Sequence, residues 1–263
     1  RGDELPEELA FRETRLKKIQ EAKAELEREA LEKAEAKKQE KETQEKEDSR
    51  PGPKPKDPDP TPASKAQKNF TDPESRIMPS SGDKKSFVQG YNCQAAVDTE
   101  NQVIVAADVT QETNDKKQSE PMLEQVVSNT GQVPIKSSMD SGYFSKENVT
   151  AAQQLGTEVF IPPDRQEHGK SIPAAPRGRI PQSLSVADRM RRKLQTKRGR
   201  KIYGKRKEPA DPVFGQIKQC RGFRQFLLRG ATKVKGEWSL VCTTHNILKL
   251  WKNSGLRKVY ATG

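Results

Sequence analysis

Six prolines fall within the twelve positions from Pro51 to Pro62, and this run limits the fold of the chain more than any other feature. Proline fixes its own backbone angle and has no backbone N–H to donate, so closely spaced prolines give an extended segment that does not pack. We therefore expect residues 50–68 to be a linker. The chain then divides into a helical spacer at 1–49, the linker, a larger domain at 69–253 and a tail at 254–263.

The residues before the linker have the pattern of one long helix over residues 4–47. Neither Gly nor Pro occurs between residues 7 and 47, and Leu16, Ile19 and Leu26 recur at helical spacings. Pairs such as Glu13 and Lys17 stand four residues apart, which adds a little helical stability. Because no apolar stripe continues past Leu31, a charged spacer and a coiled-coil dimer both stay open. The chain begins inside this pattern, so we expect it to be a fragment.

Residues 69–253 have the pattern of an α/β domain. Period-two and period-3.6 patterns predict strands at 87–98, 102–109, 133–139 and 157–161, and helices at 115–128, 145–155 and 236–251. Asp98 to Asn101 have the composition of a hairpin turn, and Ser145 has the position of a helix cap. A hairpin followed by alternating helices and strands indicates an α/β sandwich with a mixed sheet flanked by helices. We assign His245 to packing rather than to catalysis.

The charge of the chain indicates a polyanionic partner. The formal net charge is +12, and eleven of the nineteen residues from Arg189 to Lys207 are Lys or Arg. Such clustering is typical of nucleic-acid binding, so we expect DNA or RNA to contact a basic helical insertion around residues 164–207.

Cysteine and histidine content excludes two common kinds of small domain. Three cysteines lie far apart and there are two histidines, so neither a zinc finger nor a disulfide framework fits the spacing. A reducing, cytoplasmic setting agrees with this content. No apolar run approaches the length of a membrane span, and no membrane partner is expected.

Three aspartates occupy positions at which carboxylates often act. Asp72 precedes a predicted strand, Asp140 follows one and precedes Ser141-Gly142, and Asp211 follows the basic helix. In α/β sheets ligands bind beyond the carboxyl ends of strands, and hard oxygen ligands without Cys or His favour Mg²⁺ or Mn²⁺. Asp72 before Pro73 is more typical of a turn or cap, and Asp140 before Ser141-Gly142 fits a turn equally well, so the residues alone leave both interpretations open.

Several longer motifs make the chain similar to one family. They are TDPESRIM, FVQGYNCQAAVD, VIVAADVT with NDK following, MDSGYFS, DPVFGQIKQCRGFRQFLLRG and GEWSLVCTTHNILKLW. Together they resemble the catalytic region of DDE transposases from bacterial insertion sequences. The leader before the linker is similar to the spacer that precedes this region in such enzymes.

The resemblance implies an RNase H-like fold and DNA cleavage and strand transfer with two Mg²⁺ or Mn²⁺ ions. Asp72, Asp140 and Asp211 then match the three acids that hold the ions. Asp211 stands where the family has the glutamate of a Tyr…Arg…Glu…Lys signature. The residues expected to contact DNA are Tyr203, Arg206, Lys207, Lys218, Arg221 and Arg224. The resemblance also implies a homodimer on paired DNA ends and a nucleoid-associated protein.

Two departures from the family pattern keep a second interpretation open. The third acid is an aspartate, with Glu208 as the alternative ligand, and Pro209 should kink the segment that carries it. Because the chain opens in the spacer, we also expect it to be without the N-terminal DNA-binding region usual for the family. We therefore expect either an active transposase domain or a non-catalytic remnant that still binds DNA through residues 177–229.

Overall fold

The computed structural model describes residues 12–47, 59–64, 66–80, 86–165, 173, 175 and 177–253, with the side chains of the first helix described to residue 39. The chain separates into two compact units, Arg1–Gly90 and Tyr91–Gly263. Most of the predicted linker and the whole predicted tail lie outside the described residues. No helix within these ranges has the length and apolarity needed to cross a membrane.

The first unit contains one long helix and a short antiparallel strand pair. The helix α1 spans Arg12–Glu47, which confirms the predicted helix from residue 12 onward. The strands β1 (Arg76–Pro79) and β2 (Phe87–Gly90) pair with Arg76 opposite Gly90. Residues 69–90, which the motifs assign to the catalytic domain, thus group with α1, and the predicted domain limits stay a prediction.

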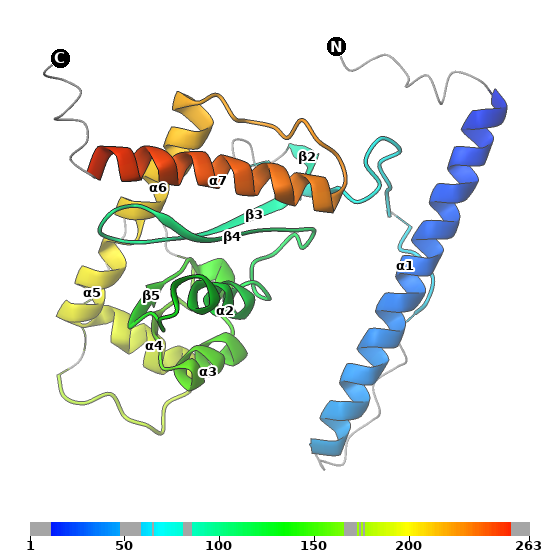
Figure 1. Cartoon of the computed structure of the whole chain (residues 1–263). Coiled ribbons are helices and arrows are strands. Elements are labelled where there is room, and N and C mark those ends of the chain that lie inside the picture. Colours follow the sequence, from blue (N-terminus) through cyan, green and yellow to red (C-terminus); the bar gives the residue numbers. More distant parts are fainter. Residues whose placement is uncertain are drawn as a thin grey trace, which may run out of the picture. The chain divides into compact units, whose positions relative to one another are not determined.

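The second unit alternates strands and helices and then continues with helices alone (Figure 1). Its elements are β3 (Asn92–Val97), β4 (Ile104–Thr110), α2 (Ser119–Thr130), β5 (Lys136–Ser138), the 3₁₀ turn η2 (Ser141–Tyr143), α3 (Lys146–Leu155), β6 (Glu158–Phe160), α4 (Val186–Gln195), α5 (Lys197–Gly204), α6 (Lys207–Gly215), the π-helical turn η3 (Gln216–Cys220) and α7 (Ala231–Asn253). Ser145 caps α3 by accepting the Asn148 N–H, as predicted.

The α/β class is confirmed, but the expected single mixed sheet is wrong for the described residues. Their strands form three separate pairs: β1–β2 and β3–β4 are antiparallel, and β5–β6 is parallel. One reason lies at β4, where helix side chains bond backbone groups as a further strand would. Asn246 of α7 accepts from Ile104 N and donates to Ile104 O, both at 2.8 Å, and Asn129 of α2 donates to Val105 O at 2.9 Å. The RNase H-like topology stays a prediction.

The β3–β4 hairpin lies between α7 and α2 (Figure 1). A bulge between Ala96 and Val97 shifts the register, so that Ile104 joins the face that packs on α7, while Ala106 packs on α2. Trp238 donates from Nε1 to Gln94 O at 3.1 Å, which ties α7 to the strand backbone.

His245 also lies on this contact surface of α7. It is fully buried, and its Nε2 lies 3.0 Å from Gln102 O. Burial lowers the pKa of its imidazole. Its assignment to packing is therefore confirmed.

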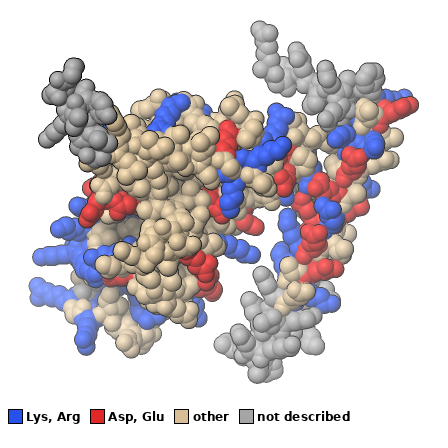
Figure 2. All heavy atoms as spheres, in the orientation of Figure 1, with Lys and Arg blue, Asp and Glu red and all other residues tan. Residues whose placement is uncertain are grey.

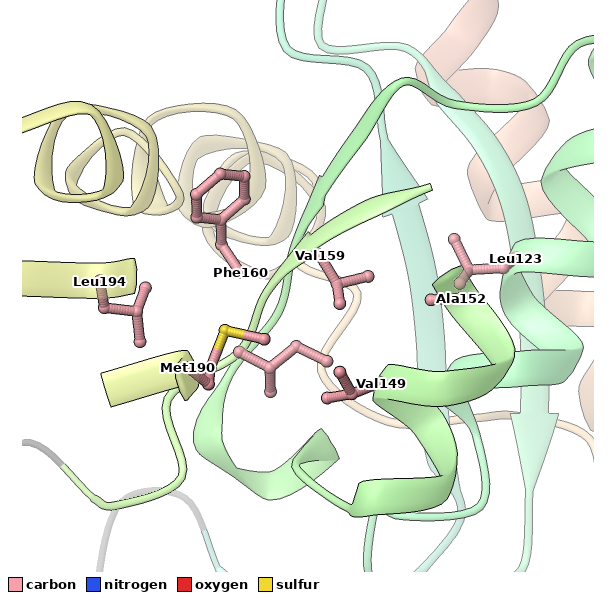
Figure 3. Close-up of a cluster of buried hydrophobic side chains, with 8 residues drawn as sticks. Leu123, Val149, Ala152, Val159, Phe160, Met190 and Leu194 are labelled. Atoms are coloured by element: carbon pink, nitrogen blue, oxygen red, sulfur yellow. The ribbon is translucent and has the colours of Figure 1, made fainter. Parts of the chain in front are cut away.

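A second core joins β6 to the helices on either side of it (Figure 3). Val159 and Phe160 of β6 are each 1% exposed and pack against α3 and α4. The other buried members are Leu123, Val149, Ala152, Ile161, Met190 and Leu194. Tyr143 and Tyr203 lie half-buried at its border.

Two sharp changes of direction shape the basic segment from α4 to α6. Between α4 and α5 the backbones approach so closely that a Cβ on Gly199 would lie 2.1 Å from the Lys193 carbonyl oxygen. Between α5 and α6 the helix is broken at Lys205–Arg206. Pro209 lies in the first turn of α6, where its ring excludes a continuous helix because it would meet the carbonyl four residues earlier. The predicted kink therefore falls just before Pro209.

Replacing Asn246 by Ala should lower the free energy of unfolding by about 1–3 kcal/mol, because the buried N–H and C=O of Ile104 lose their partners. Urea unfolding followed by the fluorescence of Trp238 and Trp251 measures the change. Asn253→Ala, which removes one exposed hydrogen bond from the same helix, is the matched control and should stay near wild type. Equal losses in both variants would contradict the role assigned to Asn246.

Replacing Gly199 by Ala should destabilise the α4–α5 corner by at least about 1–3 kcal/mol, because the added methyl meets backbone. Thermal unfolding provides the measurement. Gly204→Ala is the control, since a Cβ added at Gly204 would have no neighbour within 4 Å and alanine favours helix. A Gly199→Ala protein as stable as wild type would show that the corner relaxes freely.

Candidate active site

Asp140 lies where the chain leaves β5, beyond the carboxyl end of the strand, as predicted. Its side chain caps η2 by accepting the Ser141 N–H at 2.8 Å. The carboxylate is 59% exposed, so one face of it stays open to a ligand. Asp140 is therefore both a turn residue and an exposed carboxylate, so the two interpretations of this position are compatible.

Arg206 joins Asp140 to the basic segment. Its Nη1 lies 3.4 Å from Asp140 Oδ2, and its guanidinium carbon lies 5.4 Å from the centre of the Tyr203 ring. Burial raises the pKa of the Tyr203 hydroxyl, an effect that the charge of Arg206 opposes. Asp140, the predicted second acid, thus lies beside the Tyr and Arg of the predicted signature, although β5 and α5 are far apart in the sequence.

Asp115 is a second carboxylate in this neighbourhood, and the sequence patterns did not single it out. Its Oδ1 accepts from Asn92 Nδ2 and from Gln94 Nε2, each at 2.8 Å. Its Oδ2 would lie 3.2 Å from a Cβ on Gly142, so only glycine leaves this space free. Asp115 is the acid of the NDK motif, which contributed only to the family resemblance.

Tyr143 connects Asp115 and Asp140 through the buried Gln94. The Tyr143 hydroxyl donates to Gln94 Oε1, and the Gln94 residue is 3% exposed. Burial raises the pKa of Tyr143 well above its usual range, and the charges of Asp115 and Asp140 raise it further. Tyr143 therefore stays a neutral hydrogen-bond donor and fixes the turn that carries Asp140.

Asp72 belongs to the first unit, whereas Asp140 and Asp211 belong to the second. It opens a turn in which its carbonyl oxygen accepts from Ser75 N at 3.0 Å and from Ser75 Oγ at 2.8 Å. The residue is 8% exposed, so it is more enclosed than Asp140. Its proposed role as a metal ligand stays a prediction.

Asp211 and its alternative, Glu208, are both exposed on α6. The same helix is anchored on its other side by the buried Val213. Over the parts of the chain that the structure describes, no three His, Cys, Asp or Glu side chains lie close enough to hold a metal ion. Asp72 belongs to the other unit, so the donor set of Asp72, Asp140 and Asp211 stays a prediction, and the identity of the third acid stays open.

The predicted DNA-contacting cations differ in whether their charged groups are bonded to other residues of the chain. Lys207 and Lys218 are exposed, and Lys218 Nζ lies 5.8 Å from the centre of the Phe214 ring. Arg221 instead donates to Thr244 Oγ1 at 2.7 Å and to Thr244 O at 3.0 Å, which ties η3 to α7. Arg224 donates to Gln219 Oε1. The two lysines are thus the freer candidates for phosphate contact.

Basic side chains gather over α4 and α5, where Figure 2 shows blue atoms projecting from the second unit. Several of these cations are already paired: Arg191 bridges Asp164 and Asp188, and Arg198 pairs with Glu158. The basic segment is therefore partly neutralised by local acids.

Comparison with known proteins gives a match in the C-terminal part of the chain. Residues 174–251 match the family model described as Transposase DDE domain, a range that includes Tyr203, Arg206 and Asp211. Searches of curated proteins and of solved structures gave no significant match. The similarity of the chain to DDE transposases, which the motifs indicated, is thus confirmed over residues 174–251.

Proposed function

We propose that the chain acts on DNA as the catalytic region of a transposase, with Asp140, Tyr203 and Arg206 in its active site. The observation that carries this proposal is the 3.4 Å approach of Arg206 Nη1 to Asp140 Oδ2. It joins an acid outside the matched family range to the signature residues inside that range.

The geometry suits a site that takes up phosphate. An arginine guanidinium presents several N–H donors that fit phosphate oxygens as well as carboxylate oxygens. Arg206 is held against Tyr203 and Asp140, so it is oriented before DNA arrives. Lysines on the same segment add attraction to the DNA backbone that does not depend on base sequence.

Strand cleavage and transfer with two Mg²⁺ or Mn²⁺ ions on Asp72, Asp140 and Asp211 is what the family resemblance predicts. Asp72 belongs to one unit and Asp140 and Asp211 belong to the other, so the proposal includes no reaction step through these ions. Metal-dependent cleavage is therefore the part of the proposal that rests on the family alone.

A second function has its own support. A remnant that binds DNA without cutting it would use the exposed lysines of the basic segment, Lys207 and Lys218, and would need no complete set of acids. Asp211 in place of the family glutamate favours the same interpretation, because its carboxylate is one methylene closer to the helix.

Replacing Asp140 by Asn should abolish cleavage of supercoiled DNA carrying transposon ends, if the chain is an active transposase. The change removes the charge and keeps the shape, and loss of an essential catalytic group typically costs several orders of magnitude in rate. Agarose gels with Mg²⁺, Mn²⁺ or EDTA give the readout. Glu124→Gln, at an exposed position on α2, is the matched control.

The three outcomes of this assay are distinct. Cleavage by wild type and Glu124→Gln, lost with EDTA and in Asp140→Asn, supports the transposase. Cleavage that survives in Asp140→Asn would remove Asp140 from the site. Salt-sensitive binding with no cleavage by any protein would favour the remnant.

Replacing Lys207 and Lys218 together by Ala should weaken DNA binding and reduce its salt dependence. Each lost phosphate contact lowers the slope of log affinity against log salt by about 1. Fluorescence anisotropy at several salt concentrations measures both quantities. Lys233→Ala, an exposed lysine of α7, is the control, and an equal loss there would show that net charge alone decides binding.

A further inference from the structure

We infer that Glu29 of α1 is a positioning residue for the turn that carries Asp72. This inference rests on the proposed function, because it takes Asp72 as one of the site acids. It also changes the role of α1, which the sequence had left as either a charged spacer or a coiled coil.

A buried lysine joins the helix to the segment before the turn. Lys68 Nζ contacts Glu29 Oε1 and lies 3.2 Å from Glu25 Oε1. The Lys68 side chain is 4% exposed, although lysine is almost never fully buried without a partner. Glu25 and Glu29 stand four residues apart, so both carboxylates face the same side of α1.

Arg76 carries the contact from Glu29 to the turn itself. Its Nη2 lies 3.1 Å from Glu29 Oε1, while its Nη1 donates to Pro73 O at 2.9 Å and to Ser75 O at 3.1 Å. Both carbonyl oxygens belong to the Asp72–Ser75 turn. One carboxylate on α1 therefore orients the guanidinium that holds the backbone on the C-terminal side of Asp72.

The turn is also held from within its own segment. Ser75 Oγ donates to Asp72 O, and Asn69 Nδ2 lies 3.2 Å from Ser75 Oγ. Ser75 Oγ further lies 3.2 Å from Gln89 Oε1 on β2. These contacts define one conformation of the turn, and Glu29 provides its connection to α1.

The electrostatics of Glu29 differ from those of the other acids on the helix. Burial alone would raise its pKa, but the hydrogen bond from Lys68 and the charge of Arg76 outweigh that effect, and the pKa is lowered. By contrast, Glu27 pairs with Lys23 at 3.8 Å on an exposed face. Removing one partner of an enclosed pair costs far more than removing an exposed one, because the other charge stays buried.

Glu29→Gln and Glu27→Gln in the full chain form a matched test, since both remove one charge from the same helix. Hydrogen exchange followed by mass spectrometry should show faster exchange across residues 69–76 in Glu29→Gln, by about tenfold or more. Glu27→Gln should exchange like wild type. Unchanged exchange in Glu29→Gln, or equal acceleration in both variants, would overturn the inference.

A second readout separates positioning from general stability. Trp238 and Trp251 lie in the other unit, so their unfolding transition should be the same in both variants and in wild type. Where wild type cleaves DNA, Glu29→Gln should lower the cleavage rate constant and leave DNA affinity unchanged. Faster exchange without a change in rate would overturn the positioning role. If wild type does not cleave, the proposed activity fails, and the exchange experiment still tests whether Glu29 holds the turn.

Discussion

The buried indole of Trp238 connects the β3 strand of the second unit to the helix that follows Arg206. Its indole donates to the backbone of Gln94, and the Gln94 side chain accepts from Tyr143 in the turn that carries Asp140. Trp238 also contacts α6, because its ring stacks on that of Phe214 with ring centres 6.1 Å apart. Arg206 immediately precedes that helix. Both partners of the Asp140–Arg206 pair are therefore positioned through one buried indole on α7.

This framework does not depend on the Asp140–Arg206 pair for its stability. An ion pair whose carboxylate is 59% exposed contributes at most about 1 kcal/mol to folding. The surrounding hydrogen bonds, from Asn92 and Gln94 to Asp115 and from Tyr143 to Gln94, lie deeper and fix the turn without it. Arg206 is then free to exchange a carboxylate for a phosphate at little cost to the fold. A preorganised cation at this position suits the phosphate-handling site proposed for the chain.

Local structure could be predicted from the sequence where a single residue type decides it. Ser145 caps α3, Asp98 to Asn101 form the hairpin turn, and Asp140 follows its strand. The pairing of the strands could not be predicted. Asn246, far along the chain, bonds the backbone N–H and C=O of Ile104 in β4, which a neighbouring strand would otherwise bond. Asp115 was overlooked for a similar reason. Its importance comes from Gly142, Asn92 and Gln94, which approach it only after folding.

The charged helix α1 contains two kinds of ion pair, exposed and enclosed, within one sequence pattern. Alternating Glu and Lys predict exposed pairs of small value, and Glu27 with Lys23 is such a pair. Glu29 belongs to the same pattern, yet it meets the nearly buried Lys68 and Arg76. Periodicity cannot separate the two, because the difference lies in a segment beyond the proline run. The first unit thus combines α1 with Asp72, whereas Asp140 and Asp211 belong to the second unit. Any chemistry that uses all three acids therefore needs both units. The helix α1, whose apolar stripe ends at Leu31, contacts Lys68 and Arg76 next to one of these acids.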